Sequence, residues 1–167
     1  RLVEAMPRIV AELPDAILVF IGEGPHRKEL DRLVAKHNLD KNVRFIGRIQ
    51  YFDLPRYIAL GDIFAMPSRS RLFGLEVEGL GIVYLEASAC GLPVVGGSSG
   101  GAPDAVKDGI TGFVVDGNDV EQIAERVTYL LKDKDLRIKM GQAGREWALE
   151  EWRWQRWSNE FNKALKI

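Results

Sequence analysis

The segment EGLGIVYLEASACGLPVV, residues 78–95, decides how this chain is expected to fold. Gly79 and Gly81 interrupt regular structure at its front, and the apolar pattern of Ile82–Cys90 is typical of a helix. Gly91-Leu92-Pro93 then ends the helix and leads into a second apolar run. The segment therefore predicts a loop that enters a helix directly and is followed by a strand.

Apolar runs of strand length alternate with helical patterns along the whole chain. The expected strands are Ala16–Ile21, Val43–Ile46, Ile63–Met66, Pro93–Val95 and Phe113–Val115. The expected helices are Arg1–Leu13, His26–Asn38, Phe52–Leu60, Ile82–Cys90, one turn at Pro103–Lys107, a helix from the N-cap Asp119 to Lys132, and most of the remainder. Because the strands are apolar on both faces, the expected fold is α/β, a Rossmann-like doubly wound parallel sheet.

The composition is that of an ordinary globular domain. The 167 residues are 46% hydrophobic and 28% charged, which suits a single domain with a workable core. The net charge is −1 and Arg69 and Arg71 do not make a basic patch, so no nucleic-acid partner is expected. A single cysteine, Cys90, excludes internal disulfides and fits a reducing compartment, and we expect a cytoplasmic location.

The start of the expected helix at residue 82 has the properties of an anion site. Its first N–H groups have no partner within the helix, and the helix dipole is positive there. Gly79 and Gly81 allow a phosphate to approach the backbone closely. Glu78 precedes this site, and Glu86 lies about one turn into the helix. Carboxylates bind sugar hydroxyls better than they bind phosphates. A phosphate cradle between two such carboxylates indicates a sugar nucleotide.

Glu78 and Glu86, with seven residues between them, resemble the hallmark of the retaining family 4 glycosyltransferases, which have the two-domain GT-B architecture. The resemblance covers most of the chain in the family's order and spacing. It includes Gly22-Glu23-Gly24, Phe45-Ile46-Gly47, Asp62–Pro67, Gly91–Val95, Gly100–Pro103 and Gly112–Val115. Gly74–Val77 and Ser99–Pro103 most resemble the GDP-mannose-dependent mannosyltransferases that act on phosphatidylinositol mannosides.

The resemblance implies a role for each residue of the site. Glu78 is expected to be the catalytic residue that holds the donor sugar, and Glu86 is expected to bind the ribose. The diphosphate would lie against the N–H groups of Gly79, Leu80, Gly81, Ile82 and Val83. The other donor-binding residues that it implies are Gly22, Gly24, Gly47, Arg48, Ile49 and Gln50. No metal and no cofactor is expected, since the nucleotide-sugar, GDP-mannose by this resemblance, is the substrate.

The loops after the first two strands carry less specific signals. Gly22 and Gly24 follow a strand as in a dinucleotide fingerprint, but Arg27 stands where the third glycine belongs, which disfavours NAD. A loop near the donor phosphates and a plain turn both stay open for these glycines. Related enzymes place the nucleotide base against the backbone of the next loop, and some use an acidic residue to recognise guanine at the position aligned with Gln50.

The resemblance also implies a domain organisation. Residues 1–145 would form the donor-binding domain, and residues 146–167 a helical tail that packs on it or crosses to an N-terminal domain. The sixth strand of this fold would precede Arg1, so we expect Ala16–Ile21 and Ile63–Met66 to be separated by a gap. A glycolipid or glycan acceptor would bind through the N-terminal domain, so residues 1–167 alone are expected to transfer nothing. The whole enzyme is expected at the cytoplasmic face of a membrane.

Four alternatives to a transferase stay open at this stage. A non-catalytic nucleotide-binding or interaction module would keep the fold without the chemistry. A GT-B nucleotide-sugar epimerase would share the architecture, although its local sequence is not visible. Glu78 and Glu86 could form a glycosidase pair, but such pairs face one bond from opposite sides, whereas these two flank one helix start. Glu78 and Glu86 could also have a purely structural role, in which they accept hydrogen bonds from the free N–H groups at the helix terminus.

Overall fold

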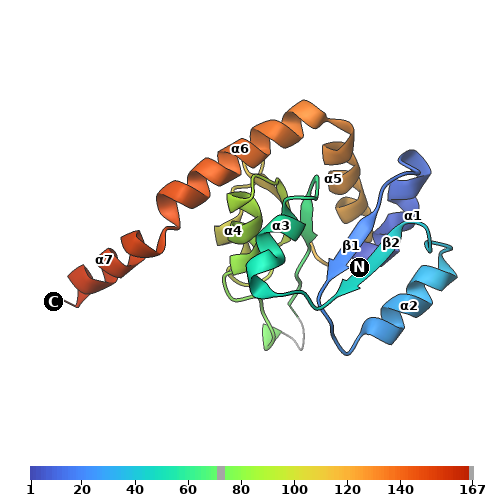
Figure 1. Ribbon diagram of the computed structural model, residues 1–167, viewed down its shortest axis with the longest axis horizontal. Coiled ribbons are helices and arrows are strands. Elements are labelled where there is room, and N and C mark those ends of the chain that lie inside the picture. Colours follow the sequence, from blue (N-terminus) through green and yellow to red (C-terminus); the bar gives the residue numbers. More distant parts are fainter. Residues whose placement is uncertain (71–73, 166–167) are drawn as a thin grey trace.

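The computed structural model describes residues 1–70 and 74–165, so Arg71 lies outside the described residues. It has an α/β fold whose strands lie in two parallel sheets (Figure 1). The first sheet pairs β1 (Leu18–Ile21) with β2 (Val43–Gly47). The second has the order β3 (Phe64–Met66), β4 (Val94–Gly97) and β5 (Gly112–Val115). The predicted strands and their parallel pairing are confirmed.

The expected gap between the first and third strands is also confirmed. β1 and β3 belong to different sheets, and no strand of the described residues pairs with both. Each of these strands therefore has one edge without a backbone partner in the described part of the chain. The two sheets are held together by side chains instead of by a shared hydrogen-bonded ladder.

Helices account for most of the remaining described residues. They are α1 (Leu2–Glu12), α2 (Arg27–Lys36), the 3-10 turn η1 (Tyr51–Asp53), α3 (Leu54–Ile58), α4 (Ile82–Ala89), the 3-10 turn η3 (Ala102–Ala105), α5 (Val120–Lys132), α6 (Lys134–Glu151) and α7 (Trp154–Ala164). Asp119 caps α5 as predicted, because its carboxylate accepts hydrogen bonds from the Glu121 and Gln122 N–H groups at 3.0 and 2.9 Å.

The continuous helix predicted for Phe52–Leu60 is wrong. η1 covers Tyr51–Asp53 with the tighter 3-10 geometry, and α3 is only five residues long. Pro55 has no N–H group, so it cannot make the α-helical hydrogen bond to the carbonyl of Tyr51. Regular α-helix therefore starts only at Leu54.

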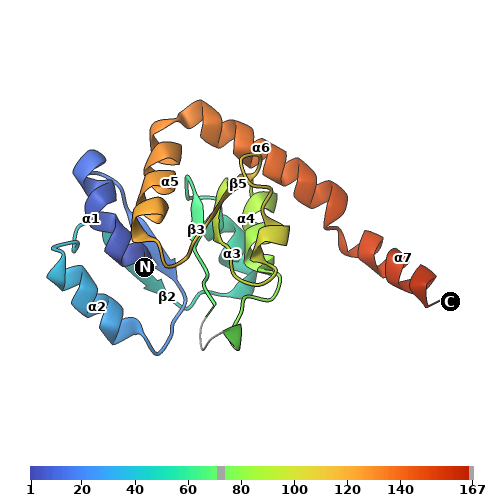
Figure 2. The ribbon, with the colours of Figure 1, turned by 180° about the vertical axis from the view of Figure 1, so that it is seen from behind.

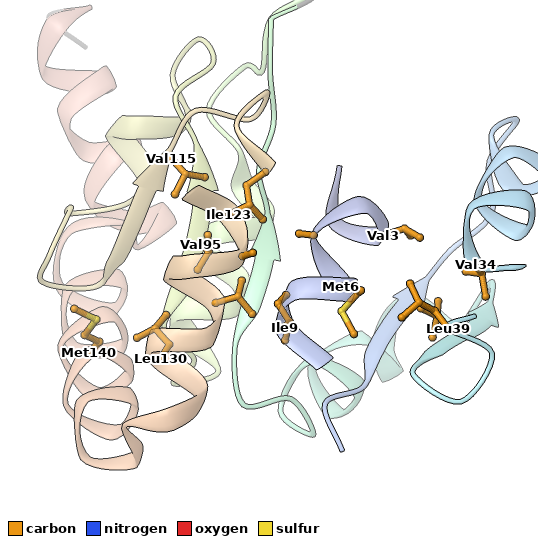
Figure 3. Close-up of a cluster of buried hydrophobic side chains, with 14 residues drawn as sticks. Val3, Met6, Ile9, Val34, Leu39, Val95, Val115, Ile123, Leu130 and Met140 are labelled. Carbon is orange, nitrogen blue, oxygen red and sulfur yellow. The ribbon is translucent and has the colours of Figure 1, made fainter. Parts of the chain in front are cut away.

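The larger hydrophobic core joins the two sheets through α1. Figure 3 shows Val3, Met6 and Ile9 of α1 between Ile123 on α5 and Val34 beside the first sheet. All five side chains are at most 7% exposed, and α1 packs chiefly against α5. Burial of a side chain of this size contributes about 1.5–3 kcal/mol, so this layer couples the sheets without strand pairing.

The C-terminal helices leave the sheets in one direction. α6 packs along α4, and Gly141 allows this because a Cβ there would lie 2.0 Å from the Gly91 carbonyl oxygen. The ring of Trp152 contacts those of Trp147 and Trp157 where α6 meets α7. α7 then extends away from the domain in both views (Figures 1 and 2) and buries none of its described side chains. The packing of residues 146–167 on this domain or on an N-terminal domain stays a prediction.

We expect Gly112→Ala to destabilise the protein by about 1–3 kcal/mol, because the new methyl group cannot be accommodated without a backbone shift. A Cβ at Gly112 would lie 1.9 Å from the Val94 carbonyl oxygen on the neighbouring strand. Gly24→Ala is the matched control, since a Cβ there meets nothing within 4 Å. Urea unfolding of both variants measures the difference, and equal unfolding midpoints would contradict the β4–β5 packing.

Candidate functional site

The start of α4 is a backbone site open to an anion. Gly81 caps the helix in the left-handed conformation, with φ 75° and ψ 53°, and the Tyr84 N–H donates to the Gly81 carbonyl at 2.9 Å. The N–H groups of Ile82 and Val83 precede the first acceptor inside the helix, so they point out of its end. A Cβ at Gly81 would lie 2.4 Å from the Tyr84 ring, so glycine is required there. The predicted loop entering a helix is confirmed, and its end can hold a phosphate.

Tyr84 anchors this helix start to the end of β3. Its side chain is fully buried, and its hydroxyl donates to the Met66 carbonyl at 2.7 Å while lying 2.8 Å from the Ser68 hydroxyl. Burial raises the pKa of Tyr84, so the phenol stays protonated and remains a donor at neutral pH. The Phe64 ring packs edge-on against it at 6.3 Å. The first turn of α4 is therefore held at the carboxyl edge of the sheet.

The loop that carries Glu78 is docked on the turn after β4. The Glu78 N–H donates to the Ser99 hydroxyl at 3.2 Å, and the Gly101 N–H donates to the carbonyl oxygens of Glu78 and Gly79 at 3.2 and 2.9 Å. A Cβ at Gly100 would lie 2.0 Å from the Glu78 carbonyl oxygen, which shows how closely the two backbones approach. Two loops that are distant in the sequence thus form one surface beside α4.

Glu86 lies in the second turn of α4 and lines a hollow of about 660 Å³. The other walls come from η1, α3 and α6, and include Tyr51, Phe52, Arg56, Cys90 and Arg145. This volume is in the range of small-molecule sites. Burial raises the pKa of the Cys90 thiol, so the thiol is protonated at neutral pH and behaves as part of the wall.

Gly22, which follows β1, and Gly47, the last residue of β2, are brought together at the edge of the first sheet. The Gly22 N–H donates to the Gly47 carbonyl at 2.8 Å, and both residues have positive φ, 114° and 80°. Gly24 is exposed. The nearness of Gly22 and Gly24 to a donor phosphate therefore stays a prediction.

The next loop leads from the first sheet to the hollow. Arg48 and Gln50 are exposed and Ile49 is half-buried. The Gln50 carbonyl accepts the Asp53 N–H at 3.0 Å and so starts η1, which forms one wall of the hollow. The loop therefore leads directly into η1, which lines the hollow together with Glu86.

Four residues of the site lay outside the sequence prediction. Tyr84 and Ser99 act through contacts with distant segments, which no local pattern reveals. Tyr51 and Phe52 are 73% and 90% exposed in the structure. In the sequence, the one signal that could have marked them was a pair of adjacent aromatic residues after a strand.

The described residues contain neither a cluster of metal ligands nor a helix that could span a membrane. Nowhere in residues 1–70 and 74–165 do three His, Cys, Asp or Glu side chains gather as metal ligands would. The helices within those ranges are all too short or too polar to cross a membrane.

Two curated relatives carry the resemblance further. The chain is 49% identical over 154 residues to the GDP-mannose-dependent alpha-(1-6)-phosphatidylinositol monomannoside mannosyltransferase of Mycolicibacterium smegmatis, covering 92% of this chain and 40% of that protein. It has the same identity and coverage with the corresponding monoacylated-substrate enzyme of Corynebacterium glutamicum. The chain thus spans about 40% of the length of these relatives. The predicted resemblance to this subfamily is confirmed.

Solved structures show the same fold. The C-terminal domain of the group 1 glycosyl transferase LpcC from Francisella tularensis is 30% identical with a TM-score of 0.80, covering 92% of this chain and 78% of that one. The Anabaena protein HepE in complex with UDP is 22% identical with a TM-score of 0.87, covering 99% of this chain and 44% of that one. These matches confirm the predicted fold class, a GT-B C-terminal domain.

The family assignment rests on nearly the whole chain. The profile of the family described as glycosyl transferases group 1 matches residues 1–147, which include both sheets and the α4 site. This chain therefore belongs to the glycosyl transferases group 1 family.

Proposed function

We propose that this chain is the donor-binding domain of a retaining mannosyltransferase that uses GDP-mannose. The observation that carries the proposal is the α4 site, where an open helix start lies between the docked Glu78 and the Glu86 that lines the hollow. The similarity to two GDP-mannose-dependent enzymes at 49% identity supports the choice of nucleotide and sugar.

The start of α4 is proposed to hold the diphosphate. The N–H groups from Gly79 to Val83 lie on the loop and first turn that Tyr84 and Gly101 hold in place. When the bond between the sugar and the diphosphate breaks, negative charge grows on the leaving phosphate. Donors already aimed at that charge need no reorganisation, so they lower the barrier.

Glu86 is proposed to bind the ribose, with the base in the adjoining hollow. A carboxylate accepts hydrogen bonds from two neighbouring ribose hydroxyls, and Glu86 is half-buried at the wall of a space large enough for a nucleoside. Gln50, at the start of η1, is placed to offer an amide or its backbone to the edge of the base. Arg48 and Ile49 precede it on the same loop.

Glu78 is proposed to hold a hydroxyl of the transferred mannose. In the sequence, Glu78 precedes the helix start and Glu86 follows it. Within the described residues the Glu78 carboxylate makes no hydrogen bond or ion pair, so it is free to accept from a ligand.

The remaining parts of the proposal concern the full-length enzyme. The two relatives are named for a phosphatidylinositol monomannoside acceptor, and we propose a glycolipid acceptor of this kind, bound outside residues 1–145. Such an acceptor would bring the enzyme to the cytoplasmic face of a membrane. We propose that the reaction uses no metal or other cofactor, and that residues 146–167 form a separate helical tail.

A nucleotide-sugar panel tests the proposed function. We expect the full-length protein to bind GDP-mannose in preference to GDP-glucose and UDP-glucose in calorimetric titrations, and to transfer mannose to a phosphatidylinositol mannoside. Transfer should persist in EDTA. Binding that ignores the sugar would favour a nucleotide-binding module, and interconversion of free nucleotide-sugars would favour an epimerase.

For Glu86 we expect Glu86→Gln in the full-length protein to weaken GDP binding by about 1.5–3 kcal/mol, because the charge-assisted hydrogen bonds to the ribose are lost. Glu146→Gln is the matched control, since Glu146 is an exposed residue of α6. Calorimetry gives both affinities. An unchanged GDP affinity in Glu86→Ala would remove Glu86 from the donor site.

A different signature is expected for Glu78. Glu78→Ala should lower the turnover number about 10²-fold or more, because a contact to the reacting sugar is lost in the transition state. Its affinity for free GDP, measured by calorimetry, should stay within about twofold of the wild type. An equal loss of GDP affinity would place Glu78 against the nucleotide and not against the sugar.

A further inference from the structure

Ser99 is a buried hydroxyl at the centre of the loops that carry Glu78. It lies in the turn after β4 and is 3% exposed. Its Oγ accepts the Glu78 N–H at 3.2 Å and lies 3.1 Å from the Ser70 hydroxyl, which comes from the loop after β3. One side chain therefore joins the loops that follow β3 and β4 to the residue proposed to hold the sugar.

The backbone of Glu78 is held on both sides by the same turn. Ser99 binds its N–H, and the Gly101 N–H binds its carbonyl at 3.2 Å. The Gly101 bond and the close approach of Gly100 hold the loop against the turn. The Ser99 bond is the contact that fixes the orientation of the peptide plane before Glu78, and hence the direction of its Cα–Cβ bond.

The carboxylate of Glu78 needs this support because the hydrogen bonds that hold Glu78 in the described residues are made by its backbone. It has no hydrogen-bond or ion-pair partner there, so its position is set by its backbone and by the ligand it meets. A reacting group that shifts by an ångström loses much of its effect on the rate. We propose that Ser99 is a positioning residue that aims Glu78 at the donor sugar. This inference rests on the proposed function, because it takes Glu78 to be the sugar-binding carboxylate.

The role differs from that of a general structural contact. If Ser99 acts through Glu78, its removal should affect the sugar and not the nucleotide, which is held by α4. Its removal should also have no further effect once the Glu78 carboxylate is gone. A contact that only stabilises the fold would affect both backgrounds equally.

A double-mutant cycle in the full-length enzyme tests the proposal. The variants are Ser99→Ala, Glu78→Ala and the double substitution, with Ser98→Ala as the control because Ser98 is the exposed neighbour in the same turn. The turnover number for mannose transfer and the affinity for GDP are measured for each. We expect Ser99→Ala to lower turnover about five- to tenfold, the size of one lost hydrogen bond, with GDP affinity unchanged.

In the Glu78→Ala background we expect Ser99→Ala to change turnover by less than about twofold. When one residue acts through another, its substitution loses most of its effect once the other residue is removed. Equal effects of Ser99→Ala in both backgrounds, or a loss of GDP affinity as large as the loss of turnover, would overturn the positioning role. The cycle distinguishes a failure of the positioning role of Ser99 from a failure of the proposed function. An enzyme in which Glu78→Ala leaves turnover unchanged would refute the role of Glu78 itself, and the role of Ser99 with it.

Discussion

The hydrogen bond from the Tyr84 hydroxyl to the Met66 carbonyl, at 2.7 Å, is the interaction on which the rest of the site depends. It joins the first turn of α4 to the end of β3, and the Tyr84 side chain that makes it is fully buried. A buried phenol without its partner would be costly, so the position of the helix is well determined. The place of the open N–H groups of α4 follows from where this one side chain is held, and the fixed rise of the helix then sets how far Glu86 lies from them.

The construction of the domain differs on its two sides. On the α4 side, backbones meet directly, because glycines at positions 97, 100 and 101 leave no room for side chains. On the α1 side, the two sheets share no ladder and are joined by the apolar layer of Val3, Met6 and Ile9. Backbone contacts are specific in distance and direction, whereas apolar packing is not directional. The arrangement therefore places the most exact geometry where the donor is proposed to bind.

The proposed donor site is built mainly from backbone groups. The cradle of α4 offers N–H groups that suit any diphosphate. The carboxylates Glu78 and Glu86 and the walls of the hollow are the side chains available to distinguish sugar and nucleoside. Solved structures with this fold include one in complex with UDP, while the relatives at 49% identity are named for GDP-mannose. In the proposed function, discrimination between nucleotides is therefore left to the hollow and not to the cradle.

The sequence by itself determined the elements whose signals are local. The glycines and apolar periodicity around Ile82 predicted α4, and so placed Glu78 just before its start. Because a helix has a fixed rise and turn, the sequence also placed Glu86 about one turn inside it. The tertiary structure alone decided the hollow beside Glu86 and the contacts of Ser99. Ser99 meets Glu78 and Ser70 across 21 and 29 positions of the chain. Such pairs depend on how the sheet brings its loops together, and a local pattern carries no information about that.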